Sequence, residues 1–222
     1  MHDVTRESLT FLGHAADPPH KDAAEHGHER GRRVQRRVPA EVDHDGSGQR
    51  GTEHLHEALL LLGHSTGHVG QSLWLEVCHG RREGKPPPVD LALERRLGEL
   101  VRQLIDAGLV SAAHDISDGG ALVAIAEMAL AGSIGARLTL PTAANPSAVV
   151  FCEDQGRILV TTSDPDAVAA RAGAANIYSA RVGETGGDAV EGPGFSAGLE
   201  ALRAAHEGFF PKLMGSELTP EF

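Results

Sequence analysis

The stretch that decides the fold runs from Ala113 to Gly120, with the sequence AHDISDGG, and continues directly into ALVAIAEMALAG at residues 121–132. Two acids, a hydroxyl and paired glycines stand before an apolar run with helical spacing, and this run ends in a glycine, where helices usually stop. Asp118 is placed to cap the first free N–H groups of the helix, and Gly119 and Gly120 permit a close backbone approach. The pattern predicts a tight strand-to-helix turn.

Two functions are compatible with this turn. It is either a capped turn with a purely structural role, or a phosphate or magnesium-nucleotide site at a helix N-terminus. The acids Asp115 and Asp118 disfavour bare phosphate contact and favour a cap or a metal-bridged contact. His114 is either a general base or a buried histidine bonded to backbone.

A second polar stretch, Glu153-Asp154-Gln155-Gly156, lies between two expected strands. A carboxylate and an amide in a loop at the end of a strand can hold a sugar hydroxyl or a metal-bound water. The alternative is a hairpin connection with polar residues. No Ser/His/Asp arrangement, phosphate-binding lysine motif or Cys/His cluster is visible, so we assign no catalytic and no metal-ligating residue.

Periodicity and breaker residues predict the remaining elements. We expect strands at 59–62, 110–114, 137–140, 148–151, 158–162 and 176–182, and helices at 71–79, 91–107, 165–173 and 196–206. The apolar face of the second helix comprises Leu97, Leu100, Val101, Leu104 and Ile105. Asp164 and Pro165 predict the start of the third helix. Alternating strands and helices indicate an α/β (α+β) fold, with a mixed sheet covered by helices.

Composition narrows the class of protein. Of the 222 residues, 41% are hydrophobic but only 4% are aromatic, so the core is expected to be aliphatic. The net charge of −11 argues against nucleic acid or an anionic membrane as a partner. Cys78 and Cys152 have no metal-ligand spacing, and we expect reduced thiols in a cytoplasmic protein. There is no signal peptide and no apolar run of about 20 residues.

The N-terminal segment has a different composition. Eleven of the thirteen histidines lie at or before His79, and residues 14–56 are rich in arginine and poor in aliphatic side chains. Such a sequence buries too little apolar surface to offset its chain entropy. We expect residues 1–57 to be either a disordered extension or a frame-shifted segment, and residues 58–222 to form the domain.

The turn and its helix resemble the C-terminal domain of the synthetase subunit of phosphoribosylformylglycinamidine synthase, in the aminoimidazole ribonucleotide synthetase-like superfamily. Further segments match the same family in the same order. They are GHSTGHVGQSLWL at 63–75, GKPPPVDL at 84–91, FCEDQGRILV at 151–160, VGETGGD at 182–188 and LRAAHEG at 202–208. The resemblance covers roughly residues 59–215, and residues 1–57 do not share it.

The resemblance implies the fold named above and a carbon–nitrogen ligase of purine biosynthesis. That enzyme converts formylglycinamide ribonucleotide, ATP and glutamine-derived ammonia to formylglycinamidine ribonucleotide. It uses Mg²⁺ and works with a glutaminase and small accessory subunits. In the family, the catalytic histidine, the ATP lysine and the metal-binding acids lie mostly in N-terminal domains that are missing here. We therefore expect a fragment that is inactive alone.

The residues expected to face substrate or nucleotide combine both polar stretches. They are Asp115, Ser117, Asp118, Gly119, Gly120, Glu153, Gln155 and Gly156. One alternative is another ATP-dependent enzyme of the superfamily, such as aminoimidazole ribonucleotide synthetase, selenophosphate synthetase, thiamine monophosphate kinase or the hydrogenase maturation factor. A further alternative is a non-catalytic dimerisation module.

Overall fold

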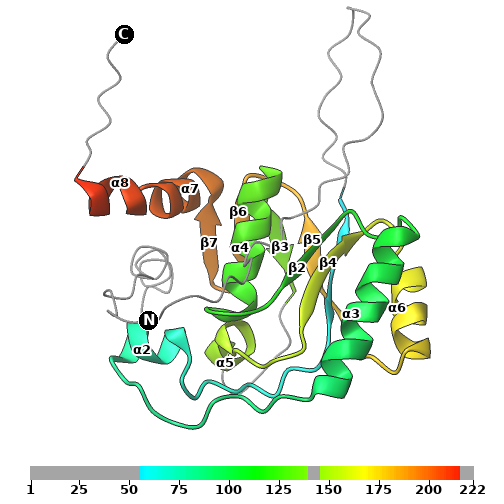
Figure 1. Cartoon of the computed structure of the whole chain (residues 1–222). Coiled ribbons are helices and arrows are strands. Elements are labelled where there is room, and N and C mark those ends of the chain that lie inside the picture. The colour runs from blue at the N-terminus through cyan, green and yellow to red at the C-terminus, as the bar shows by residue number, and fades with distance from the viewer. Residues whose placement is uncertain (1–55, 140–145, 216–222) are drawn as a thin grey trace, which may run out of the picture.

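A single mixed sheet forms the middle layer of the domain, in a computed structural model that describes residues 56–139 and 146–215. Within these residues the sheet has seven strands in the order β2-β4-β1-β5-β3-β6-β7. The strands are β1 (Ala58–Leu62), β2 (Ala112–Asp115), β3 (Ala136–Leu138), β4 (Ile158–Thr162), β5 (Ser179–Thr185), β6 (Ala189–Gly192) and β7 (Phe195–Gly198). Helices cover both faces, so the α/β expectation is confirmed (Figure 1).

The four successive leucines at 59–62 lie in strand β1, in the interior of the sheet. This strand pairs antiparallel with β4 on one side and with β5 on the other. Side chains alternate between the two faces of a strand, so Leu59 belongs to one core cluster and Leu60 and Leu62 to the other. A strand that is covered on both faces reads as a continuous apolar run.

One face of the sheet is covered by α3 (Leu91–Asp106) and α6 (Pro165–Ala174), which lie together in Figure 1. Asp90 caps α3 by accepting hydrogen bonds from two backbone N–H groups, and Asp164 caps α6 with Pro165 at its first position. The buried residues of this core are Leu60, Leu62, Leu97, Leu100, Val101, Leu104, Val160, Val168, Ala172 and Ile177. The sequence predicted both helices and the Asp164-Pro165 start of α6, but not the Asp90 cap of α3.

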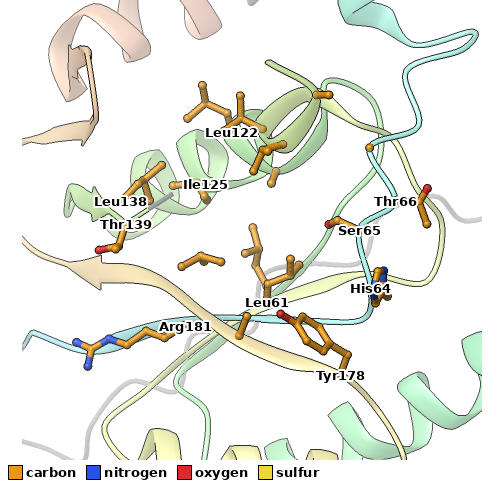
Figure 2. A pocket seen from close by; sticks show the side chains of 18 residues that line it. Leu61, His64, Ser65, Thr66, Leu122, Ile125, Leu138, Thr139, Tyr178 and Arg181 are labelled. Atoms are coloured by element: carbon orange, nitrogen blue, oxygen red, sulfur yellow. The ribbon is translucent and has the colours of Figure 1, made fainter. Parts of the chain in front are cut away.

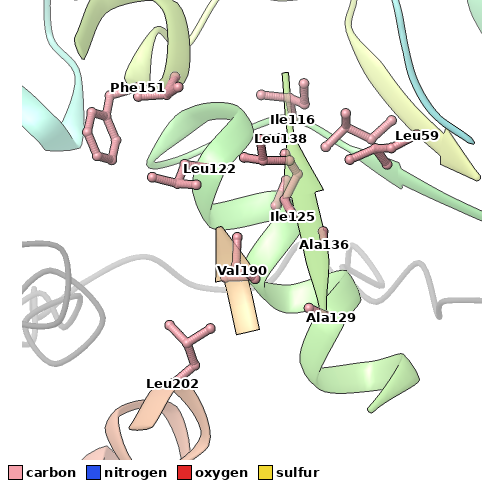
Figure 3. Close-up of a cluster of buried hydrophobic side chains, with 14 residues drawn as sticks. Leu59, Ile116, Leu122, Ile125, Ala129, Ala136, Leu138, Phe151, Val190 and Leu202 are labelled. Carbon is pink, nitrogen blue, oxygen red and sulfur yellow. The ribbon is translucent and has the colours of Figure 1, made fainter. Parts of the chain in front are cut away.

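The opposite face is covered by α4 (Gly120–Gly132), with α5 (Pro146–Phe151) and α7 (Leu199–Glu207) beside it. Figure 3 shows Leu122, Ile125 and Ala129 along α4, close to residues of β3 and β6. Leu202 of α7 extends this core. Helix α4 has only one charged residue, Glu127, which fits its burial.

The remaining elements are short. Helix α2 (Leu73–His79) begins at Ser72, whose hydroxyl accepts from the Leu75 N–H. Strands β6 and β7 form a hairpin around Pro193 and Gly194. Helix α8 (Phe209–Met214) ends the described chain and was not predicted.

Several predicted elements need correction. Residues 148–151, expected to be a strand, belong to helix α5, and this segment packs against α4 instead of pairing in the sheet. Residues 195–198 are strand β7, so the final helix begins at Leu199 and not at 196. Ile105 is 36% exposed, so the apolar face of α3 is narrower than its spacing indicated.

The expectation for residues 1–57 falls almost entirely outside the described residues. His56 and Glu57 are described, and the Glu57 carbonyl accepts a hydrogen bond from the Thr185 N–H. None of the described helices is long and apolar enough to cross a membrane.

The glycine turn generates a stability prediction. Gly120 has φ +72°, and a Cβ there would lie 2.7 Å from backbone atoms of Val150, Phe151 and Cys152. We expect Gly120→Ala to lower the free energy of unfolding by about 3 kcal/mol or more, through backbone strain and clash together. Gly98→Ala is the matched control.

Gly98 lies in α3, and a Cβ there meets nothing within 4 Å. Gly98→Ala should raise the free energy of unfolding by up to about 1 kcal/mol, because alanine has a higher helix propensity than glycine. Urea unfolding of both variants measures the difference. Equal effects would contradict the close contact at Gly120.

Candidate functional site

Three loops meet at one end of the sheet, and we call this region the loop junction. They are residues 63–72, 115–120 and 152–157. Antiparallel pairing brings them together: the end of β1 and the end of β2 both lie opposite the start of β4, where Leu62 and Asp115 each pair with Ile158. Three of the segments that carry the family resemblance are therefore neighbours in space.

Arg157 is the centre of the loop junction and is only 2% exposed. Its Nη2 donates to the Cys152 carbonyl at 2.6 Å and its Nε to the Asp154 carbonyl at 3.0 Å. Its Nη1 donates to the Ser65 hydroxyl at 3.0 Å and lies 3.2 Å from the Cys152 sulfur. A buried guanidinium needs such partners, so its position fixes the backbone of two loops together.

Asp154 joins loop 152–157 to loop 63–72. Its Oδ2 accepts from the N–H groups of Thr66 at 2.9 Å and Gly67 at 3.0 Å, and its Oδ1 accepts from the Thr66 hydroxyl. Burial alone would raise the pKa of Asp154. The hydrogen bonds from Thr66 and the charge of Arg157 outweigh burial and hold that pKa below its ordinary value.

Glu153 joins the same loop to the glycine turn. One oxygen, Oε1, accepts from the Gly119 N–H and from the Leu73 N–H, each at 2.8 Å. Burial raises the pKa of Glu153 despite these two hydrogen bonds, and the nearby charge of Asp118 raises it further. Glu153 thus accepts hydrogen bonds from the first residue of α2 and from the N-cap residue of α4.

The expected cap at Asp118 is wrong. The N-cap of α4 is Gly119, with φ +80° and no side-chain hydrogen bond, and the Gly119 N–H is satisfied by Glu153 instead. The left-handed Gly119-Gly120 pair turns the chain so that Asp118 faces solvent. Asp115 and Ser117 are exposed as well.

The last two expected site residues differ in setting. Gln155 is exposed, and its amide makes a 3.4 Å hydrogen bond to the Glu153 carbonyl. Gly156 is buried with φ +69°, and its carbonyl lies so close to Gly63 that a Cβ on Gly63 would be 2.0 Å away. Gly156 therefore serves close packing of two loops.

A cavity of about 630 Å³ opens beside the loop junction, between α4 and the sheet (Figure 2). Its wall is mainly apolar, with Leu61, Leu122, Ile125 and Leu138 around it, while Ser65 and Thr66 lie at the side of the junction. Both hydroxyls are already engaged, by Arg157 and Asp154. The cavity suits an apolar group better than a phosphate.

The junction presents acceptors outward and keeps its cation inside. Asp115, Ser117 and Asp118 face solvent, whereas Arg157 is buried and fully engaged. Such a surface can accept hydrogen bonds from hydroxyl or amine groups. Within the described parts of the chain, no three His, Cys, Asp or Glu side chains gather to hold a metal ion.

Sequence reasoning placed both polar stretches in the site but missed the residues that connect them. The structure joins the two stretches through the hydrogen bond from the Gly119 N–H to Glu153. Arg157, Ser65 and Thr66 were overlooked. The only signal in the sequence for this buried cation was the position of Arg157, at the end of a polar loop and directly before an apolar strand.

A mixed sheet covered by helices on both faces, with a glycine turn at the start of α4, defines an α/β domain. The family model for "AIR synthase related protein, C-terminal domain" matches residues 56–193. The chain therefore belongs to this family.

Curated relatives are closely similar over most of the described domain. The Caulobacter vibrioides phosphoribosylformylglycinamidine synthase subunit PurL is 47% identical over 161 residues, covering 72% of this chain and 22% of that protein. The Bradyrhizobium sp. (strain ORS 278) PurL is 49% identical over 163 residues, with the same coverage. The chain thus spans about a fifth of the length of these relatives.

Among solved structures, T. maritima PurL complexed with FGAR has a TM-score of 0.55 and 19% identity. It covers 66% of this chain, and the match is 27% of that protein. At this identity the likeness shows the fold alone, in agreement with the family assignment.

The corrected role of Asp118 is testable by a pair of alanine variants. We expect Asp118→Ala to change the free energy of unfolding by less than about 0.5 kcal/mol, because it removes no cap. Asp164→Ala should lose about 1 kcal/mol, since Asp164 accepts from the Ala167 N–H at the start of α6. Thermal or urea unfolding distinguishes them, and a loss at Asp118 equal to that at Asp164 would restore the cap.

Glu153 yields a second pair. Glu153→Ala leaves the N–H groups of Gly119 and Leu73 without their acceptor, and we expect a loss of about 2 kcal/mol in unfolding free energy. Glu153→Gln keeps an amide oxygen in the same place and should lose less than about 1 kcal/mol. Similar losses for both variants would show that the charge of Glu153, and not its position as an acceptor, matters.

Proposed function

We propose that this chain is the C-terminal part of the synthetase subunit of phosphoribosylformylglycinamidine synthase. The observation that carries the proposal is the 47% identity to a curated PurL across the region that forms the loop junction. In the proposed reaction, the amide oxygen of formylglycinamide ribonucleotide receives a phosphoryl group from ATP. Ammonia then adds to the amide carbon, and phosphate leaves to give the amidine.

In this proposal the loop junction forms part of the wall of the substrate cleft. Asp115, Ser117 and Asp118 would accept hydrogen bonds from hydroxyl or N–H groups of the ribonucleotide. Gly119, Gly120 and Gly156 keep the backbone close-packed behind them, and Glu153 with Gln155 fixes the loop. The acceptor-rich outer surface supports a role beside the sugar and amide and disfavours direct phosphate binding.

ATP and Mg²⁺ do not fit the described residues of this chain as a complete site. The acids Glu153 and Asp154 accept hydrogen bonds from backbone N–H groups, and the wall of the neighbouring cavity is mainly apolar. We therefore assign the holding of ATP and Mg²⁺ to the portion of the relatives that this chain does not span.

We also propose partners for the complete enzyme. A glutaminase and small accessory subunits would deliver ammonia, in the cytoplasm, to the complete enzyme. The PurLQS structure of T. maritima, with a TM-score of 0.51 over 66% of this chain, has the same fold in its matching part.

A chimaeric enzyme tests the proposal. The aligned region of C. vibrioides PurL is replaced by the corresponding residues of this chain, and formylglycinamidine ribonucleotide formation is measured with ammonia and Mg-ATP. We expect the chimaera to be active and this chain alone to be inactive. An inactive but folded chimaera, or product from the chain alone, would contradict the proposal.

Within the chimaera, Asp118→Asn should raise the KM for formylglycinamide ribonucleotide about tenfold, which corresponds to the loss of one charge-assisted hydrogen bond. Stability should not change, because Asp118 caps nothing. Asp166→Asn, an exposed acid on α6, is the control and should leave the KM unaltered. Equal KM values for both variants would show that Asp118 does not contact the substrate.

A further inference from the structure

His114 lies at the end of β2 and bridges this strand to α4. Its Nδ1 is 2.6 Å from the backbone carbonyl oxygen of Asp115, and its Nε2 is 3.3 Å from Oε2 of Glu127. The imidazole is only 18% exposed. Both ring nitrogens therefore face oxygen atoms that can only accept hydrogen bonds.

This arrangement determines the protonation state that fits. A neutral imidazole has one N–H, so it can satisfy only one of the two acceptors, whereas the imidazolium donates to both. The hydrogen bond to Glu127 raises the pKa of His114 above its ordinary value. Burial opposes this but does not cancel it.

The charged neighbours of His114 are few. On its own strand, the carboxylate of Asp115 has Oδ1 4.0 Å from Nδ1. From α4, the one charged residue is Glu127, and from β4, which pairs with β2, no residue is titratable. The positive charge of the ring is thus balanced by Glu127 on one side and lies beside the exposed Asp115 on the other.

We propose that His114 is a positioning residue of the candidate site. As an imidazolium it holds the Asp115 carbonyl and Glu127 together, fixes the entry to the glycine turn, and offsets the negative charge that Asp115 presents to a phosphate-bearing substrate. The consequence for substrate rests on the proposed function, whereas the bridge itself belongs to the folded chain alone.

The bridge predicts a direction with pH. The folded state binds the proton of His114 more tightly than the unfolded state does. The bridge therefore stabilises the fold fully below the ordinary pKa of 6.5. This stabilisation is lost as pH rises through the higher pKa of folded His114. Over the same range Asp115 loses its neighbouring positive charge. The KM for an anionic ribonucleotide should therefore rise, while kcat changes less.

The first experiment follows the histidine ring signals of the full chain by NMR across pH, with His114 assigned from the signal lost in His114→Gln. We expect the pKa of His114 to lie above its ordinary value of 6.5, and Glu127→Gln to lower it. The stability of the wild-type chain should also fall more steeply as pH rises above 6.5 than that of His114→Gln. If the pKa of His114 is not raised, or does not respond to Glu127→Gln, the bridge is refuted.

The second experiment measures KM and kcat against pH in the active chimaera. We expect KM to rise several-fold over this range, His114→Gln to flatten the profile, and His206→Gln to leave it unchanged. A KM profile that persists in His114→Gln would overturn the positioning role. If the chimaera is inactive while the NMR titration holds, the proposed function fails and the bridge stands.

Discussion

The buried guanidinium of Arg157 is the constraint on which the loop junction depends. A charge that is 2% exposed is tolerated because two backbone carbonyls and a hydroxyl accept its hydrogen bonds and Asp154 lies close by. These partners come from two loops that are about ninety residues apart in the chain. Removing any one of them would leave a donor or a charge unsatisfied in the interior, so the loops can only adopt a conformation in which all of them meet.

The sheet explains why these loops are neighbours. Strand β1 lies between β4 and β5, and antiparallel pairing brings its last residue opposite the first residue of β4. Strand β2 joins the same end through its pairing with β4. The Glu153 carboxylate then uses this proximity to hold the start of α2 and the start of α4. Packing of the sheet therefore determines the site, and the loops contribute the hydrogen bonds that complete it.

The distribution of charge separates this surface from a phosphate-binding site. Arg157 is buried, the acids Asp115 and Asp118 are exposed, and Nδ1 of His114 lies 4.0 Å from Oδ1 of Asp115. A substrate that carries hydroxyl, amide and phosphate groups would meet acceptors first. This is consistent with a domain that contributes one wall of a cleft and relies on other parts of a larger protein for cations.

The sequence by itself determined the elements whose cause is local. Three local patterns predicted their elements: the four leucines of β1, the apolar spacing of α3, and Asp164-Pro165 at the start of α6. Burial pattern and capping act within a few residues, so these elements could be read from the sequence. Only the tertiary structure decided the rest. Asp118 looked like a cap, but Glu153 satisfies the same N–H from 34 residues away. Residues 148–151 have strand propensity, yet they form a helix that packs against α4. Contacts between distant segments override local preference whenever they satisfy more buried polar groups or bury more apolar surface.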